Sequence, residues 1–335
     1  NAIKWVNSQT VPAPVPSLFS FEYTLEAAMK NSLILKKYDY DLEKAIEAQP
    51  NTIVSYGSEV RPMDQLDTLL HNHPNFERFS HNMTNGISYP TKELDEKTRL
   101  NLVKKQLKKG NHTSSLEEEA IPHVTKAMKT DVTRGFGIIL TKKCVKNIKD
   151  AEVYPMGLQH QMTINELGAP VPKKRVCHDL SNDRRKGLSL NQRDEQIPGV
   201  MFGHTFNRFL HMIHHIRYFY PNERILLNKV DIEKAYRRLH VSGKTAAKCI
   251  ATWVLNQDKD YTGKQEEIAI ALGRLPFGSK PAPAEFSNAS DLTFDLANDQ
   301  MNCTLWDTET MPCPLKKDIP PPNRLPDSIP FGKAH

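Results

Sequence analysis

Asp231 is the first side chain whose type and position suggest chemistry. It follows a short, mainly apolar run, residues 225–230, which predicts a buried strand. In open α/β sheets, side chains at such a strand end emerge into a ligand crevice. Because an unpaired buried charge is costly, a carboxylate there either pairs with a cation of the protein or binds a metal ion. Tyr236 follows in the next turn of chain, and Arg237 and Arg238 predict a basic surface beside it.

A second phrase, L-P-F-G, ends at Gly278. Gly278 has no Cβ and can therefore bring the backbone close to a ligand. Pro281 and Pro283 cannot lie inside a helix but can begin one. The phrase predicts a loop that leads into an amphipathic helix. The residues expected on the inner face of that helix are Phe286, Ala289, Thr293, Leu296 and Ala297.

The D-x-x-x-A-Y phrase that begins at Asp231 and the later L-P-F-G phrase resemble motifs A and B of reverse transcriptases, in the order in which retroelement polymerases carry them. The resemblance implies that Asp231 binds the catalytic magnesium ions, with the backbone carbonyl of Ile232 nearby. It implies that Tyr236 lies beneath the sugar of the incoming nucleotide and excludes a ribose 2′-OH. Phe277 and Gly278 would line the nucleotide and template pocket.

Each phrase also has an ordinary structural interpretation. Asp231 could be a surface carboxylate after a core strand, and Tyr236 could be an aromatic residue packed on a helix. Phe277 and Gly278 could form a simple turn before a helix. Short motifs match by chance, and the two phrases together are more specific than either alone.

A basic stretch, residues 172–191, precedes both phrases. Lysine and arginine held on a strand can clamp the charges of a triphosphate. The K-K-R-V-C-H-D-L-S letters and the later L-N resemble the fingers strand of reverse transcriptases, where a lysine and an arginine hold the phosphates of the nucleotide. The resemblance assigns this role to Arg175 with either Lys173 or Lys174, and the sequence does not choose between the two lysines. A solvated basic hairpin is the alternative.

The second carboxylate that two-metal chemistry requires is not found in the sequence. The family takes it from an aromatic-x-Asp-Asp phrase, motif C, after motif B, and no such phrase follows here. The chain after residue 301 is proline-rich and predicts a linker. The other acidic residues considered fall on a predicted helix or in a polar turn, namely Asp258, Asp260, Asp295 and Asp299.

The expected fold is α+β, with polymerase-like fingers, an incomplete palm, a helical amino-terminal extension and a proline-rich tail. The expected division is a helical region of unknown role (1–115), reverse-transcriptase-like fingers and partial palm (116–300), and a tail or linker (301–335).

Periodicity and capping signals give the expected elements. Thr91 is the expected N-cap of the third helix, and a Ser115–Glu118 capping box is expected to begin the fourth. The expected helices are residues 20–49, 62–71, 92–109, 115–129 and 205–219. The expected strands and extended segments are residues 135–140, 153–164, 225–230, 248–255 and 266–272, with a polar turn at 257–265. The resemblance to the fingers of reverse transcriptases implies a further strand within residues 172–191.

Composition excludes several classes of protein. No window is apolar enough for a membrane span, and no signal-peptide pattern opens the chain. Five scattered cysteines favour reduced thiols over a disulfide framework or a zinc site, so we expect an intracellular protein, in the cytoplasm or the nucleus. A net charge of +6 is compatible with nucleic-acid binding but does not demonstrate it.

The function that the resemblance implies is RNA-directed DNA synthesis by a retroelement polyprotein. In the complete protein, a primer 3′-OH would attack a dNTP with Mg²⁺ as cofactor. The expected partners are an RNA or DNA template-primer, dNTP, and the rest of the polyprotein: the remaining palm, the thumb, RNase H and integrase. Because the chain opens with Asn1 and lacks motif C, we expect a fragment that does not polymerise by itself. The alternatives are a non-catalytic nucleic-acid-binding remnant and a structural interaction protein.

Overall fold

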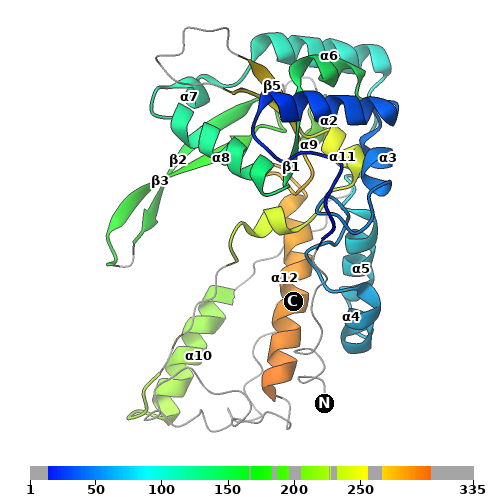
Figure 1. The fold of residues 1–335 in the computed structure, drawn as a ribbon. Coiled ribbons are helices and arrows are strands. Elements are labelled where there is room, and N and C mark those ends of the chain that lie inside the picture. Colours follow the sequence, from blue (N-terminus) through cyan, green and yellow to red (C-terminus); the bar gives the residue numbers. More distant parts are fainter. Residues whose placement is uncertain are drawn as a thin grey trace.

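The computed structural model describes residues 14–165, 167–182, 187–195, 205–225, 227, 232–255 and 266–302. These residues form a mixed α and β structure with two antiparallel sheets (Figure 1). One sheet has three strands in the order β1-β5-β4, and the other is a hairpin of β2 and β3. The coarse α+β prediction is therefore confirmed, while its polymerase-like details stay a prediction.

The three-stranded sheet is the centre of the described structure. Its strands are β1 (Gly137–Thr141), β4 (Ile250–Val254) and β5 (Glu267–Leu272). Strand β5 lies between the other two and pairs antiparallel with both. All three strands are buried along most of their length, which fits their short, continuous apolar sequences. The predicted strands at residues 135–140, 248–255 and 266–272 are thus confirmed.

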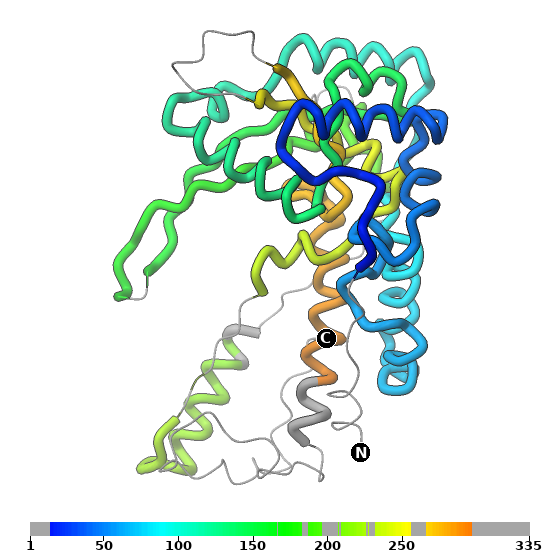
Figure 2. The backbone as a smooth tube through the Cα atoms, in the orientation of Figure 1, coloured from blue at the N-terminus to red at the C-terminus, as the bar shows by residue number. Residues whose placement is uncertain are grey.

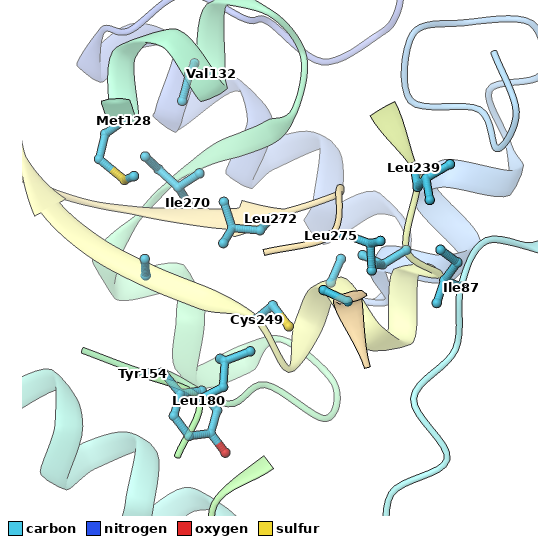
Figure 3. Packing of buried hydrophobic residues seen from close by; sticks show 14 of the residues in the cluster. Ile87, Met128, Val132, Tyr154, Leu180, Leu239, Cys249, Ile270, Leu272 and Leu275 are labelled. Atoms are coloured by element: carbon cyan, nitrogen blue, oxygen red, sulfur yellow. The ribbon is translucent and has the colours of Figure 1, made fainter. Parts of the chain in front are cut away.

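Side chains of the sheet alternate between two hydrophobic clusters, one on each face. Ile139 and Ile270 belong to the first cluster, and their neighbours Ile138 and Ala271 belong to the second. Figure 3 shows Ile270 and Leu272 in the first cluster together with residues of α8. The N-terminal helices contribute residues to both clusters, so they share the cores of the sheet. The predicted domain boundary near residue 115 stays a prediction.

The described residues also form a series of α-helices. They are α2 (Leu25–Lys37), α3 (Leu42–Glu47), α4 (Met63–Leu70), α5 (Phe76–Asn85), α6 (Glu96–Lys109), α7 (Thr113–Leu116), α8 (Ile121–Thr133), α9 (Leu190–Arg193), α10 (Thr205–Phe219), α11 (Gly243–Ala247) and α12 (Ala282–Asn302). Two 3₁₀ helices are η1 (Lys142–Asn147) and η3 (Ala235–Arg238). None of the described helices combines the length and the apolar character that crossing a bilayer requires.

Two predicted helix caps are wrong. The carboxylate of Asp95, not Thr91, caps α6 by accepting the N–H of Thr98 at 2.9 Å. The hydroxyl of Ser115 donates to the carbonyl of His112, and α8 begins at Ile121 instead of continuing from a capping box. At α6 the Asp95 carboxylate satisfies the helix end in place of the expected side chain, whereas no side chain caps α8.

Helix α12 confirms the predicted helix after the L-P-F-G phrase, with one correction to its inner face. Phe286, Ala289 and Leu296 pack against the first cluster as expected. Thr293 is exposed, and Leu292 is the buried residue of that turn. A hydroxyl is more easily solvated than buried, so the apolar neighbour takes the inner position.

The hairpin of β2 (Met156–Ile164) and β3 (Pro170–His178) extends away from the three-stranded sheet (Figure 2). Within the described part, Cys144, Cys177 and Cys249 are free thiols, as predicted. The predicted turn at residues 257–265, most of the predicted strand at 225–230, and the tail from residue 303 lie outside the described residues.

Candidate functional site

Strand β3 places its basic side chains on opposite faces. Arg175 pairs in register with Gln159, and Lys173 pairs with Gln161. Because side chains alternate along a strand, Lys173 shares a face with Arg175, whereas Lys174 faces the other way. Lys174 forms an ion pair with Glu119 at 3.1 Å. Of the two lysines that the sequence left open, Lys173 is therefore the one on the same face of β3 as Arg175.

Three segments that are distant in sequence meet at the ring of Phe277. The guanidinium carbon of Arg175 lies 5.4 Å from the centre of this ring. The ring of Tyr236, from η3, lies 5.7 Å from it and 5.6 Å from Phe286 of α12. These distances are in the range of cation–π and aromatic contacts. The cluster of Arg175, Tyr236 and Phe277 is called the aromatic–arginine cluster below.

The turn after Leu275 holds Phe277 against the end of β3. The carbonyl of Phe277 accepts the N–H of His178 at 2.9 Å. Gly278 has a φ of +114°, and a Cβ at that position would lie 2.0 Å from the carbonyl oxygen of His178. Only glycine permits this approach without moving the backbone. Gly278 thus packs closely against the backbone of β3, whereas its predicted approach to a nucleotide stays a prediction.

Arg237 fixes the other side of the same turn. Its Nη1 donates to the carbonyl of Leu275 at 2.8 Å, and its Nη2 pairs with the carboxylate of Asp131 at 2.7 Å. Both partners of the ion pair are largely buried. The prediction that Arg237 contributes to a basic surface is therefore wrong, because its charge is neutralised inside the protein. Arg238 is more exposed and pairs with Glu59.

Burial and the charge of Arg175 both affect the polar groups of the aromatic–arginine cluster. Burial raises the pKa of the Tyr236 hydroxyl, and the positive charge of Arg175 lowers it in part. The Nε of Arg175 is buried and has no hydrogen-bond partner among the described residues. A buried donor without a partner is costly, and an acceptor oxygen placed beside it would relieve that cost.

His178 is buried where β3 meets the turn. Burial lowers its pKa to about 3, and the positive charge of Arg237 adds to the effect. The folded-state pKa therefore lies below the value of the unfolded chain, about 6.5. Between these two pH values the unfolded chain binds a proton that the folded chain does not. Stability contributed by His178 is therefore full at neutral pH and is lost as the pH falls from about 6.5 toward about 3.

We expect His178 alone to lower the free energy of unfolding by about 2 kcal/mol between pH 7 and pH 5. Urea unfolding at the two pH values measures this change. His240 is also buried with a depressed pKa and contributes in the same direction, so the comparison must be made between the native chain and His178→Gln. An equal pH dependence in the two proteins would contradict the assignment.

The predicted metal ligands are only partly placed. Asp231 lies outside the described residues, and Ile232 is exposed in the segment that leads into η3. Within the described ranges, no three His, Cys, Asp or Glu side chains gather as a metal site.

The predicted site residues thus fall into two groups. Arg175, Tyr236, Phe277 and Gly278 come together, with Lys173 on the same strand face, whereas Lys174 is directed elsewhere. Sequence reasoning missed His178, whose contacts depend on a turn far away in the chain. No protein-family model, curated protein or solved structure matches the chain.

Proposed function

We propose that the chain is the fingers and partial palm of a retroelement reverse transcriptase, and that its aromatic–arginine cluster binds an incoming deoxynucleotide. The complete protein would transfer nucleotides from dNTP to a primer 3′-OH on an RNA or DNA template. The observation that carries the proposal is the meeting of Arg175, Tyr236 and Phe277, which the motif resemblance assigns to one nucleotide site.

Arg175 supplies the positive charge of the proposed site. Its guanidinium can donate to phosphate oxygens, and its contact with Phe277 holds the group in place. Lys173 lies two residues away on the same face of β3 and is exposed. An arginine and a lysine on one strand face suit a triphosphate, because both bind phosphate oxygens by charge-assisted hydrogen bonds.

Tyr236 supplies the surface on which the sugar would rest. Its ring is half-buried between Phe277 and Phe286, so it cannot easily move aside. A fixed ring beneath the sugar would discriminate against an added 2′-OH by steric exclusion. These residues are proposed to bind and orient the nucleotide. Magnesium is the ion that Asp231 is expected to bind.

The first test measures binding of the fluorescent nucleotide mant-dATP to the whole chain in the presence of template-primer duplex. We expect Arg175→Ala to weaken binding at least about tenfold, because it removes charge-assisted bonds to phosphate. Arg217→Ala is the matched control, since the Arg217 guanidinium bonds the carbonyls of Pro221 and Glu223. Equal losses in the two variants would show that the effect is not specific to the cluster.

A second variant tests the sugar contact. Tyr236→Ala should bring the affinities for unlabelled ATP and dATP closer together by about tenfold, because the ring no longer excludes the 2′-OH. Competition of each nucleotide against bound mant-dATP measures the ratio. An unchanged ratio would contradict the proposed role of Tyr236.

The second candidate function is a non-catalytic nucleic-acid-binding remnant. It is favoured by the basic segment that contains Lys173 and Arg175 on β3. Binding to duplex would then weaken steeply with salt. Asp231→Asn would change neither nucleotide nor duplex binding, whereas it should alter magnesium-dependent nucleotide binding if the polymerase proposal is correct.

A further inference from the structure

Both the nitrogen and the oxygen of the Asn191 carboxamide, on α9, form hydrogen bonds. Its Nδ2 donates to the carbonyl of Gly278 at 2.9 Å and to the hydroxyl of Ser181 at 2.8 Å. Its Oδ1 accepts the backbone N–H of Lys280 at 2.9 Å. One side chain thus joins the turn that carries Phe277 to the segment that follows β3.

These bonds complete the support of the turn. His178 holds the carbonyl of Phe277, and Arg237 holds the carbonyl of Leu275. Asn191 bonds the carbonyl of Gly278 and the N–H of Lys280, at the carboxyl end of the turn. The turn is therefore fixed from β3, from η3 and from α9, which are separate in the chain. An unsupported turn that contains glycine would sample many more backbone conformations.

The pattern of bonds requires a carboxamide. Aspartate could accept the N–H of Lys280 but would place a negative oxygen against the carbonyl of Gly278. Leucine has a similar size and can make none of the three bonds. Glutamine has an extra methylene, which displaces both the donor and the acceptor.

We propose that Asn191 is a positioning residue for the nucleotide site: it holds the Gly278–Lys280 backbone so that the ring of Phe277 stays beside Arg175. This inference rests on the proposed function, because it takes the aromatic–arginine cluster to be the nucleotide site. Asn191 acts through the turn and does not itself contact the nucleotide.

The experiment combines two measurements on the whole chain. Hydrogen exchange followed by mass spectrometry reports on the peptide that covers residues 275–281, and mant-dATP titration reports on affinity. Asn191→Leu should speed exchange of at least one amide in that peptide about tenfold and weaken mant-dATP binding about tenfold. Exchange in the β4 and β5 peptides should not change, because the global fold does not depend on this contact.

Two further variants make the test specific. Asn182→Leu is the matched control, since the Asn182 side chain bonds Gln106 on α6 rather than the turn. It should leave both measurements unchanged. Asn191→Asp keeps the bond to Lys280 and should lose less affinity than Asn191→Leu, about threefold. If Asn191→Leu does not fold, the same two measurements on Asn191→Asp provide the test.

The outcomes separate the inference from the proposed function. Unchanged exchange in residues 275–281 would overturn the inference, and so would faster exchange with unchanged affinity. If the native chain does not bind mant-dATP, the proposed function is overturned and the nucleotide role of Asn191 with it. In that case faster exchange in Asn191→Leu would still establish Asn191 as one of the residues that hold the turn.

Discussion

Replacing Gly278 with alanine should destabilise the folded chain by at least about 3 kcal/mol. The added Cβ would lie 2.0 Å from the carbonyl oxygen of His178, so the turn and the end of β3 must separate. The φ of +114° is itself strained for any residue with a Cβ. Because the carbonyl of Phe277 bonds the N–H of His178, this separation would also displace Phe277 from Arg175. Urea unfolding and mant-dATP binding measure the two consequences.

Gly168→Ala provides the control for backbone strain. Gly168, in the connection between β2 and β3, has a φ of +79°, and a Cβ there meets nothing within 4 Å. Its substitution should cost only about 1 kcal/mol. The difference between the two variants in lost free energy of unfolding measures the cost of the steric contact with His178. Equal destabilisation of the two proteins would mean that the close approach in the turn relaxes freely.

Arg193→Met should lower the free energy of unfolding by about 3–5 kcal/mol. The Nη2 of Arg193 donates to both carboxylate oxygens of Glu152, at 2.5 and 2.6 Å, and both side chains are almost fully buried. Glu152 also accepts the hydroxyl proton of Tyr154 at 2.6 Å. Removing the guanidinium would leave a buried carboxylate without its counter-charge. Chemical denaturation at pH 7 measures the loss.

Two comparisons make this prediction specific. Arg134→Met breaks an exposed pair with Glu233 and should cost less than about 1 kcal/mol. In the double variant with Glu152→Gln, the buried charge is absent, so part of the stability lost in Arg193→Met should return. If Arg193→Met were no worse than Arg134→Met, the buried pair would not stabilise the fold as proposed.

The elements that could be predicted from the sequence are those with a strong local pattern. Helix α10 has the predicted bounds, and β4 and β5 form the predicted antiparallel hairpin. Pro62 precedes α4, as its fixed φ angle indicates. In each case apolar spacing or a proline already specifies the element, and tertiary packing does not override it.

Other features depend on contacts that local patterns do not encode. Helices α5 and α11 were not expected, and α11 is only five residues long. The choice of Lys173 over Lys174 needed the register of β3, because a shift of one residue reverses the faces. Arg237 is expected at the surface from its sequence, but Asp131 on α8 neutralises its charge in the interior.

For the candidate site, the sequence predicted which residues meet but not what holds them. Arg175, Tyr236, Phe277 and Gly278 were expected from the motif resemblance, and the structure brings them together. The supports supplied by His178 and Asn191 are bonds to or from the main chain of the turn. Such bonds have no sequence pattern of their own, since any residue offers the same backbone groups.

The order of strands in the central sheet also constrains how the chain folds during synthesis. Strand β5 lies between β1 and β4, and Gly137 of β1 pairs with Leu272 at the end of β5. The ribosome must therefore complete β5 before β1 gains its partner, and closing so long a loop is slow. Until then an apolar strand edge stays open to other nascent chains. Chaperone dependence during translation should consequently end only after Leu272 has emerged.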